Sequence, residues 1–129
     1  MSDIVEIYIP DSVVFIGRDA FYGCTKLQKV RLPKTLDSIY ECTFSDCKQL
    51  SSIVVPENVR TIYVCAFRRC TNLESAVFLN PYKMGVDDAA FLNCDNLTIY
   101  SDVKYDIVDK DGFMTPVKPL SAYKGRIDQ

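Results

Sequence analysis

The stretch FYGCTKL at Phe21–Leu27 recurs three times further along the chain, as FSDCKQL at Phe44–Leu50, FRRCTNL at Phe67–Leu73 and FLNCDNL at Phe91–Leu97. Each copy places an aromatic residue first, a cysteine three positions later and a leucine after three more. The phenylalanines lie 23, 23 and 24 residues apart, and the cysteines keep the same spacing. A period of this length over most of a chain is typical of a solenoid, in which each repeat forms one coil stacked on its neighbours.

Each period also contains a short run of alternating apolar residues, as at Val30 and Leu32, which predicts a β-strand with one buried face. A proline closes this run at Pro10, Pro33 and Pro56, because proline cannot donate to a β ladder and is tolerated at strand ends. Coils stacked about 4.8 Å apart form parallel strands, so we expect ladders of phenylalanine and of leucine inside. A second inward-facing pair recurs on the return side: Val13 and Ile16, Leu36 and Ile39, Val59 and Ile62.

The string IPDSVVFIGRDAFYGCTKLQKVRLPKTL at residues 9–36 resembles the BspA-like (treponemal-type) leucine-rich repeats of bacterial and protozoan proteins. The resemblance extends over about residues 4–100, across several copies of the pattern. It implies an α/β-type repeat solenoid, a right-handed stack of about four to five 23-residue repeats with a parallel β-sheet on one face. Members of this family are commonly surface or secreted proteins implicated in adhesion and protein binding.

The period divides the chain into a solenoid over residues 1–100 and a non-repeat segment over residues 101–129. We expect the second segment to be a C-terminal cap, because the last coil must be covered. Within it, DIVDKDG at Asp106–Gly112 resembles a calcium loop superficially, but Ile107 would occupy the first ligand position. We therefore expect a hairpin turn at Lys110–Gly112. The last interval is one residue longer, so the loop at Asn80–Gly85 should bulge.

Composition argues against several functional classes. The formal net charge of −2 does not suit nucleic acid, which normally requires a basic face. No apolar run approaches the roughly 18 residues of a membrane span. The chain has no histidine, which removes histidine-dependent triads and dyads and histidine-ligated metals. We therefore expect no enzyme and no cofactor; an enzyme would need a cysteine nucleophile that acts without histidine.

The N-terminal stretch MSDIVEIYIPDS has neither the basic region nor the apolar region of a secretory signal. A native start at Met1 would thus suggest the cytoplasm, whereas a chain trimmed from a longer relative would belong to the cell surface or be secreted. The repeat pattern begins with the first expected strand, Ile4–Pro10, so we expect this strand to be uncapped. Because an open apolar edge is prone to pair, we expect a homodimer in which two such edges meet about a two-fold axis.

The six cysteines fall into two groups. One column, Cys24, Cys47, Cys70 and Cys94, follows the repeat and should hold buried free thiols that pack as small hydrophobic side chains. A zinc site built from the two CxxxxC spacings is disfavoured for this reason. Cys42 and Cys65 differ, because their column holds Asp19 in the first repeat and Ala89 in the last. They are the candidate reactive thiols; the competing interpretation is that they are partly exposed and inert.

Strand residues that alternate with buried ones should face outward on the sheet and form two stripes. We interpret these stripes as a candidate protein-binding face, because Tyr and Arg beside exposed valines are typical of binding surfaces. The alternative is that β-branched residues simply suit strands. On the return side, Gly17, Tyr40 and Tyr63 share a column that is either a ligand platform or cross-strand packing, which we favour. The stripes are Tyr8, Arg31, Val54 and Val77, and Glu6, Lys29, Ser52 and Ser75.

Taken together, these features predict a non-catalytic interaction module that binds a protein through the outward face of its repeat sheet. The alternative from another class is a structural spacer, a solenoid segment of a larger surface protein with no ligand of its own. The residues do not identify the partner.

Overall fold

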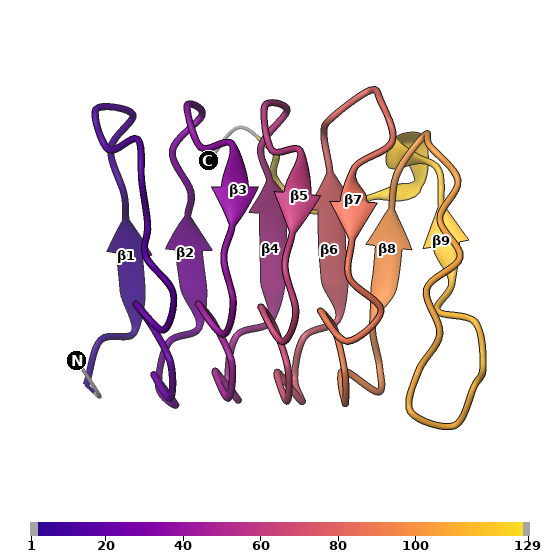
Figure 1. The fold of residues 1–129 in the computed structure, drawn as a ribbon, viewed down its shortest axis with the longest axis horizontal. Helices are drawn as coiled ribbons and strands as arrows, with labels where there is room; N and C mark the ends of the chain where they lie inside the picture. The colour runs from indigo at the N-terminus through magenta and orange to yellow at the C-terminus, as the bar shows by residue number, and fades with distance from the viewer. Residues whose placement is uncertain (1–2, 128–129) are drawn as a thin grey trace.

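The computed structural model describes residues 3–127, which form a row of stacked coils (Figure 1). The main sheet runs along one side of the stack and contains only parallel pairs. The strands pair in the orders β1-β2 and β4-β6-β8-β9, and they stand side by side in Figure 1. Their bounds are β1 Glu6–Tyr8, β2 Lys29–Arg31, β4 Ser52–Val55, β6 Ser75–Phe78, β8 Thr98–Tyr100 and β9 Val117–Lys118.

A second row of shorter strands, β3 Ser38–Ile39, β5 Thr61–Ile62 and β7 Gly85–Val86, forms the return side of the coils. Partners in neighbouring coils are one period apart, as in Ile39 with Ile62, so the register follows the sequence repeat. Helix is almost absent, since residues 3–127 contain one short 3-10 helix, η1 at Leu120–Ala122. The prediction of a parallel-strand repeat solenoid is confirmed.

The interior consists of ladders, because identical side chains recur at the same place in each coil. Phe21, Phe44, Phe67 and Phe91 stack with ring centroids 5.3, 5.4 and 5.1 Å apart and with nearly parallel planes. The repeated leucines are buried beside them, with Leu50 and its counterpart in the next coil wholly inaccessible. This packing confirms the predicted phenylalanine and leucine ladders and explains why the repeat retains these two residue types.

The coil corners have left-handed backbone at two positions in each of the first three repeats and at one position in the fourth. One column contains Asp19, Cys42 and Cys65, with φ of 62°, 57° and 59°. The other contains Gly23, Asp46, Arg69 and Asn93, with φ between 61° and 71°. Glycine, asparagine and aspartate adopt this conformation most readily, which accounts for three of the four residues in the second column.

The loop between β6 and β7 is the widest of those joining the two rows of strands (Figure 1). The Asn80 side chain organises it, because its Nδ2 donates to the Val59 carbonyl at 2.7 Å while its Oδ1 accepts from the Tyr82 amide at 2.9 Å. Tyr82 is 78% exposed as a result. The predicted bulge in this segment is therefore confirmed.

The segment after the last repeat begins with a hairpin and then extends the sheet. An antiparallel bridge joins Val108 to Met114, and Asp109 Oδ1 accepts from the Asp111 and Phe113 amides at 2.9 Å. The hairpin turn thus lies where the sequence predicted it. Strand β9 then pairs in parallel with β8, so this segment completes the sheet as well as following it. The division of the chain at residue 100 stays a prediction.

After β9, residues 119–127 turn back along the main sheet, and we call this segment the C-terminal strap. The Asp102 carboxylate holds its start by accepting from the Leu120 amide at 3.0 Å. Its Tyr123 ring packs on Tyr100 of β8, with centroids 5.1 Å apart, and the strap reaches a groove that Arg31 of β2 also lines. Ile127 lies in a groove that is also lined by Val54 of β4.

The strap corrects one sequence-based expectation. Val54 and Val77 were expected to face solvent, but Val77 is wholly buried and Val54 is 9% exposed. The alternation did place them on the outer face of the sheet; the strap then covers that face. Their β-branched side chains form a second, smaller packing layer under the C-terminal segment.

Candidate protein-binding surface

The eight predicted surface residues lie on four strands in the expected register. Glu6 pairs with Lys29 and Tyr8 with Arg31 across β1 and β2, while Ser52 pairs with Ser75 across β4 and β6. The serines are half-buried, whereas Tyr8 is 63% exposed. The open part of the outer face is therefore restricted to the first two coils. We call Glu6, Tyr8, Lys29 and Arg31 the open face; the Arg31 side chain is itself 11% exposed.

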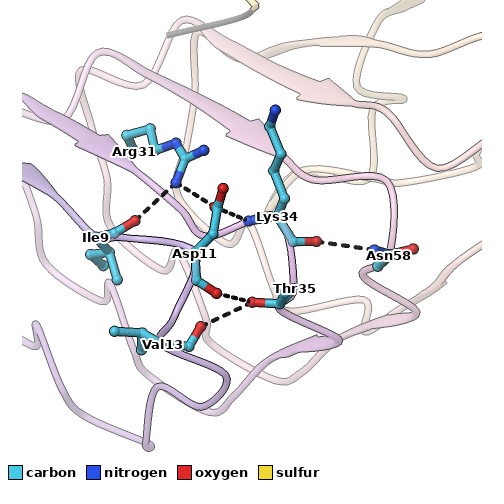
Figure 2. A network of polar contacts seen from close by, with 7 residues as sticks. All are labelled: Ile9, Asp11, Val13, Arg31, Lys34, Thr35 and Asn58. Atoms are coloured by element: carbon cyan, nitrogen blue, oxygen red, sulfur yellow. Dashed lines mark hydrogen bonds and ion pairs between the residues drawn. The ribbon is translucent and has the colours of Figure 1, made fainter.

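Arg31 is the most constrained residue of the open face. Its Nη1 donates to the Asp11 carboxylate at 2.6 Å and to the Ile9 carbonyl at 3.0 Å (Figure 2). Its guanidinium carbon lies 4.7 Å from the centre of the Tyr8 ring, in cation–π geometry. The hydrogen bond to Asp11 raises the pKa of Arg31 further, so its charge is permanent. The side chain is held in one position before any partner arrives.

Asp11 organises the network around it. Its carboxylate also accepts from the Lys34 amide at 2.8 Å, and its own carbonyl accepts from the Thr35 hydroxyl at 2.9 Å. The hydrogen bond from Arg31, with a second from the Lys34 amide, lowers the pKa of Asp11 below its ordinary value. Asn58 extends the network to a third coil by donating to the Lys34 carbonyl at 3.1 Å (Figure 2).

Sequence reasoning missed Asp11. The signal for it was an acidic residue directly after Pro10, in a column continued by Lys34 and Glu57. This column faces the strand ends of the neighbouring coils, so a carboxylate there reaches the arginine of the next strand. Charge alternation down one column was visible in the sequence, but the partner across the coil was not.

Two open grooves adjoin Arg31, one on each side, and the C-terminal strap bounds both. The first has a volume of about 280 Å³ and an apolar floor with a charged rim. The second, of about 440 Å³, lies over the open face. The first is lined by Arg31, Leu32, Lys34, Val54, Pro56, Glu57, Leu79 and Ile127, and the second by Glu6, Ile7, Tyr8, Lys29, Arg31 and Arg126.

On the return side, the aromatic column is packing between coils. Tyr40 and Tyr63 stack with centroids 5.3 Å apart and planes within 9° of parallel, so the ring faces between them cover each other. Gly17 supplies no side chain to this column, and Phe15 takes its place with its ring 5.5 Å from that of Tyr40. This stacking between neighbouring coils favours cross-strand packing over a sugar-stacking platform.

The repeat-column cysteines are buried, as predicted, and they also donate hydrogen bonds. Cys47 Sγ donates to the Phe21 carbonyl at 3.2 Å, and Cys70 donates to that of Phe44 at 3.1 Å. Cys94 repeats the contact one coil further on. Burial raises the pKa of Cys47 to about 12, so this thiol is protonated and unreactive at neutral pH.

In residues 3–127, no three His, Cys, Asp or Glu side chains converge in a way that could hold a metal ion. None of the helical structure in this range is long and apolar enough to cross a bilayer.

The stacked coils, the 23-residue period and the phenylalanine ladder together define a leucine-rich-repeat solenoid. The model of the BspA type leucine rich repeat region matches residues 1–114 with six copies, and the chain belongs to this family. The family model thus finds six repeats where we expected four to five, because its match continues to residue 114, within the segment that we expected to be a cap. No curated protein matches the chain.

Two solved structures resemble it over most of its length. One is a leucine rich cell surface protein from Faecalibacterium prausnitzii A2-165, with 32% identity over 74% of this chain and a TM-score of 0.68. The other is a leucine-rich repeat protein from Bacteroides ovatus ATCC 8483, with 34% identity over 76% of this chain and the same TM-score. The chain spans 25% of the length of each.

Proposed function

We propose that the protein is a non-catalytic interaction module of the adhesion type, which binds a protein partner through the open face. The observation that carries this proposal is the Tyr8–Arg31 pair, an exposed aromatic ring under a fixed guanidinium. Tyrosine and arginine dominate the energetics of protein interfaces. A side chain that is already immobilised loses little further entropy on binding, which favours affinity.

The covered half of the outer face does not belong to this surface. Val54 and Val77 lie under the strap, and the half-buried Ser52 and Ser75 can serve only as its margin. The groove of about 280 Å³ beside Arg31 offers an apolar floor at that margin, where a partner side chain could be buried. Protein interfaces often have an aromatic residue and an arginine at their centre, surrounded by a rim. The Tyr8–Arg31 pair beside a small apolar groove has this arrangement.

The name of the Faecalibacterium relative supports a role at the cell surface. That protein is described as a leucine rich cell surface protein, and this chain matches a quarter of it. A repeat module within such a protein would present its sheet face to other macromolecules outside the cell. A spacer without a ligand is the alternative, and the fixed Tyr8–Arg31 pair is what favours binding over it.

The test is a pull-down from the proteins of the source cell or its host. Tyr8→Ala should abolish capture of a specific partner while it preserves the Arg31–Asp11 ion pair. Tyr8→Ala with Arg31→Ala should also abolish capture. The matched control is Tyr82→Ala with Arg60→Ala, two exposed residues that line one groove away from the open face, which should capture as the unmodified protein does. Equal capture by the Tyr8 variants would contradict the proposed surface, and no specific capture by the unmodified protein would favour the spacer.

A further inference from the structure

Cys42 and Cys65 occupy the same corner of two neighbouring coils. Backbone hydrogen bonds hold the two coils in register on both sides of them: the Tyr63 amide donates to the Ile39 carbonyl at 2.9 Å and the Phe44 amide to the Ala66 carbonyl at 2.8 Å. Both cysteines have left-handed φ, at 57° and 59°. The two side chains therefore leave the backbone in the same direction from adjacent coils.

Their surroundings differ from those of the other four cysteines. Cys42 and Cys65 are partly exposed, whereas Cys24, Cys47 and the two later members of that column are buried. Burial raises the pKa of the Cys42 thiol, and the charge of the neighbouring Cys65 raises it further. The register of the two coils places the two thiols beside each other. The corner thus presents two adjacent thiols that solvent can reach.

We propose that Cys42 and Cys65 form a reversible disulfide between the two coils, with a low-molecular-weight disulfide such as oxidised glutathione as the oxidant. The thiolate of one cysteine attacks a glutathione sulfur, which forms a mixed disulfide and releases one reduced glutathione. The second cysteine, as its thiolate, attacks the protein sulfur of that mixed disulfide and releases the other glutathione. Two thiols and one oxidised glutathione thus give one protein disulfide and two reduced glutathiones.

The geometry makes this bond labile. Stacked coils place equivalent Cβ atoms about 4.8 Å apart, whereas a relaxed disulfide prefers about 3.8 Å. Closing the bond must draw the two corners together, and strained disulfides are more easily reduced. The bond also closes a chain segment that runs once around the solenoid, so oxidation should resist separation of these two coils.

The experiment treats the full chain with oxidised glutathione at mildly alkaline pH and maps peptides without reduction. The expected product is a single Cys42–Cys65 linkage, with the other four thiols titratable only after denaturation. Reduced glutathione in excess should then reopen the bond. The rate should rise with pH, because the raised pKa of Cys42 limits its thiolate at neutral pH.

Two variants distinguish pairing from simple exposure. Cys42→Ser should leave Cys65 carrying a stable glutathione adduct, since no second thiol can displace it. Cys24→Ser, in the buried column, should leave the Cys42–Cys65 linkage unchanged. Glutathione retained on both cysteines of the unmodified protein, a linkage between other cysteines, or no reaction at either would overturn the proposal. A linkage that resists excess reduced glutathione would overturn its reversibility.

Discussion

At the scale of single residues, stability and recognition depend on side chains that repeat and on a few that do not. Phe44 and Phe67 are middle rungs of the phenylalanine ladder, with a ring stacked on each side. Asp11 is not repeated in the next two coils, where Lys34 and Glu57 occupy its column, and its carboxylate fixes Arg31 of the candidate surface. The repeated phenylalanines hold the coils together, whereas Asp11 shapes the surface at one end of the stack.

Phe67→Ala should destabilise the protein by about 3–5 kcal/mol, because it removes a wholly buried ring and leaves a cavity between two other rings. Urea unfolding followed by circular dichroism measures this change. The control is Phe113→Ala, at a hairpin position that is 71% exposed, which should change stability by less than about 0.5 kcal/mol. An equal loss of stability in the two variants would show that the phenylalanine ladder does not stabilise the core.

Acidification should weaken the Asp11 network. The pKa of Asp11 is lower in the folded state than in the unfolded state, so its contribution is complete above about pH 3.9 and is lost as the pH falls through the folded-state pKa. Asp11→Asn should therefore destabilise the protein more at about pH 7 than at about pH 2. Urea midpoints at both pH values measure the effect. A constant difference, or the same pattern in the exposed control Asp88→Asn, would contradict this assignment.

At the scale of elements, β1 is the first strand of the main sheet, and within residues 3–127 it pairs on one side only, with β2. The Val5 carbonyl accepts from the Gln28 amide, and the Ile9 amide donates to Arg31, so these groups face β2. By alternation, the amide and carbonyl groups of Glu6 and Tyr8 point to the free edge. This edge is where we propose that a second copy pairs.

Glu6→Pro should convert a dimer into a monomer in sedimentation at tens of micromolar, because it removes one edge donor and leaves the β1–β2 bonds in place. Glu6→Ala is the matched control, since it changes the same side chain and keeps the amide. If the unmodified protein sediments as a monomer, the edge-to-edge dimer is wrong. If both variants dissociate, the side chain rather than the strand edge makes the contact.

At the scale of the whole molecule, the C-terminal strap decides which part of the sheet is open. It packs Tyr123 on Tyr100 and places Ile127 in the groove beside Val54. Gly125 permits this course, because a Cβ atom at that position would overlap the Tyr123 ring. The strap therefore depends on a glycine that lies outside every repeat.

Gly125→Ala should displace the Tyr123 ring and loosen the strap. We expect faster tryptic cleavage after Lys124 and Arg126, together with greater binding of an apolar dye as the buried valines become exposed. Gly85→Ala is the matched control, because a Cβ there meets its neighbours at ordinary contact distance, 3.9 Å. Unchanged cleavage in Gly125→Ala would show that the strap is not held by this packing.

Much of the fold could be predicted from the sequence, because each repeat places the same residue types at the same positions. The alternation at Val30 and Leu32 and the recurrent Phe–Cys–Leu spacing identified the strands, the ladders and their register. Stacking neighbours one period apart follows from the repeat alone, because a single coil cannot bury its own apolar side. The wide loop after β6 was predictable as a departure from the period, and the hairpin turn was predictable from the turn sequence Lys110–Gly112.

The candidate surface was only half predictable, because it depends on segments that do not repeat. Alternation placed Val77 correctly on the outer face, but burial there is set by a strap some forty residues later in the chain. Likewise, the proximity of Asp11 to Arg31 requires the actual path of the coil corner. Local pattern specifies which way a side chain points from its own strand, whereas solvent exposure and ion pairing depend on what the rest of the chain brings against it.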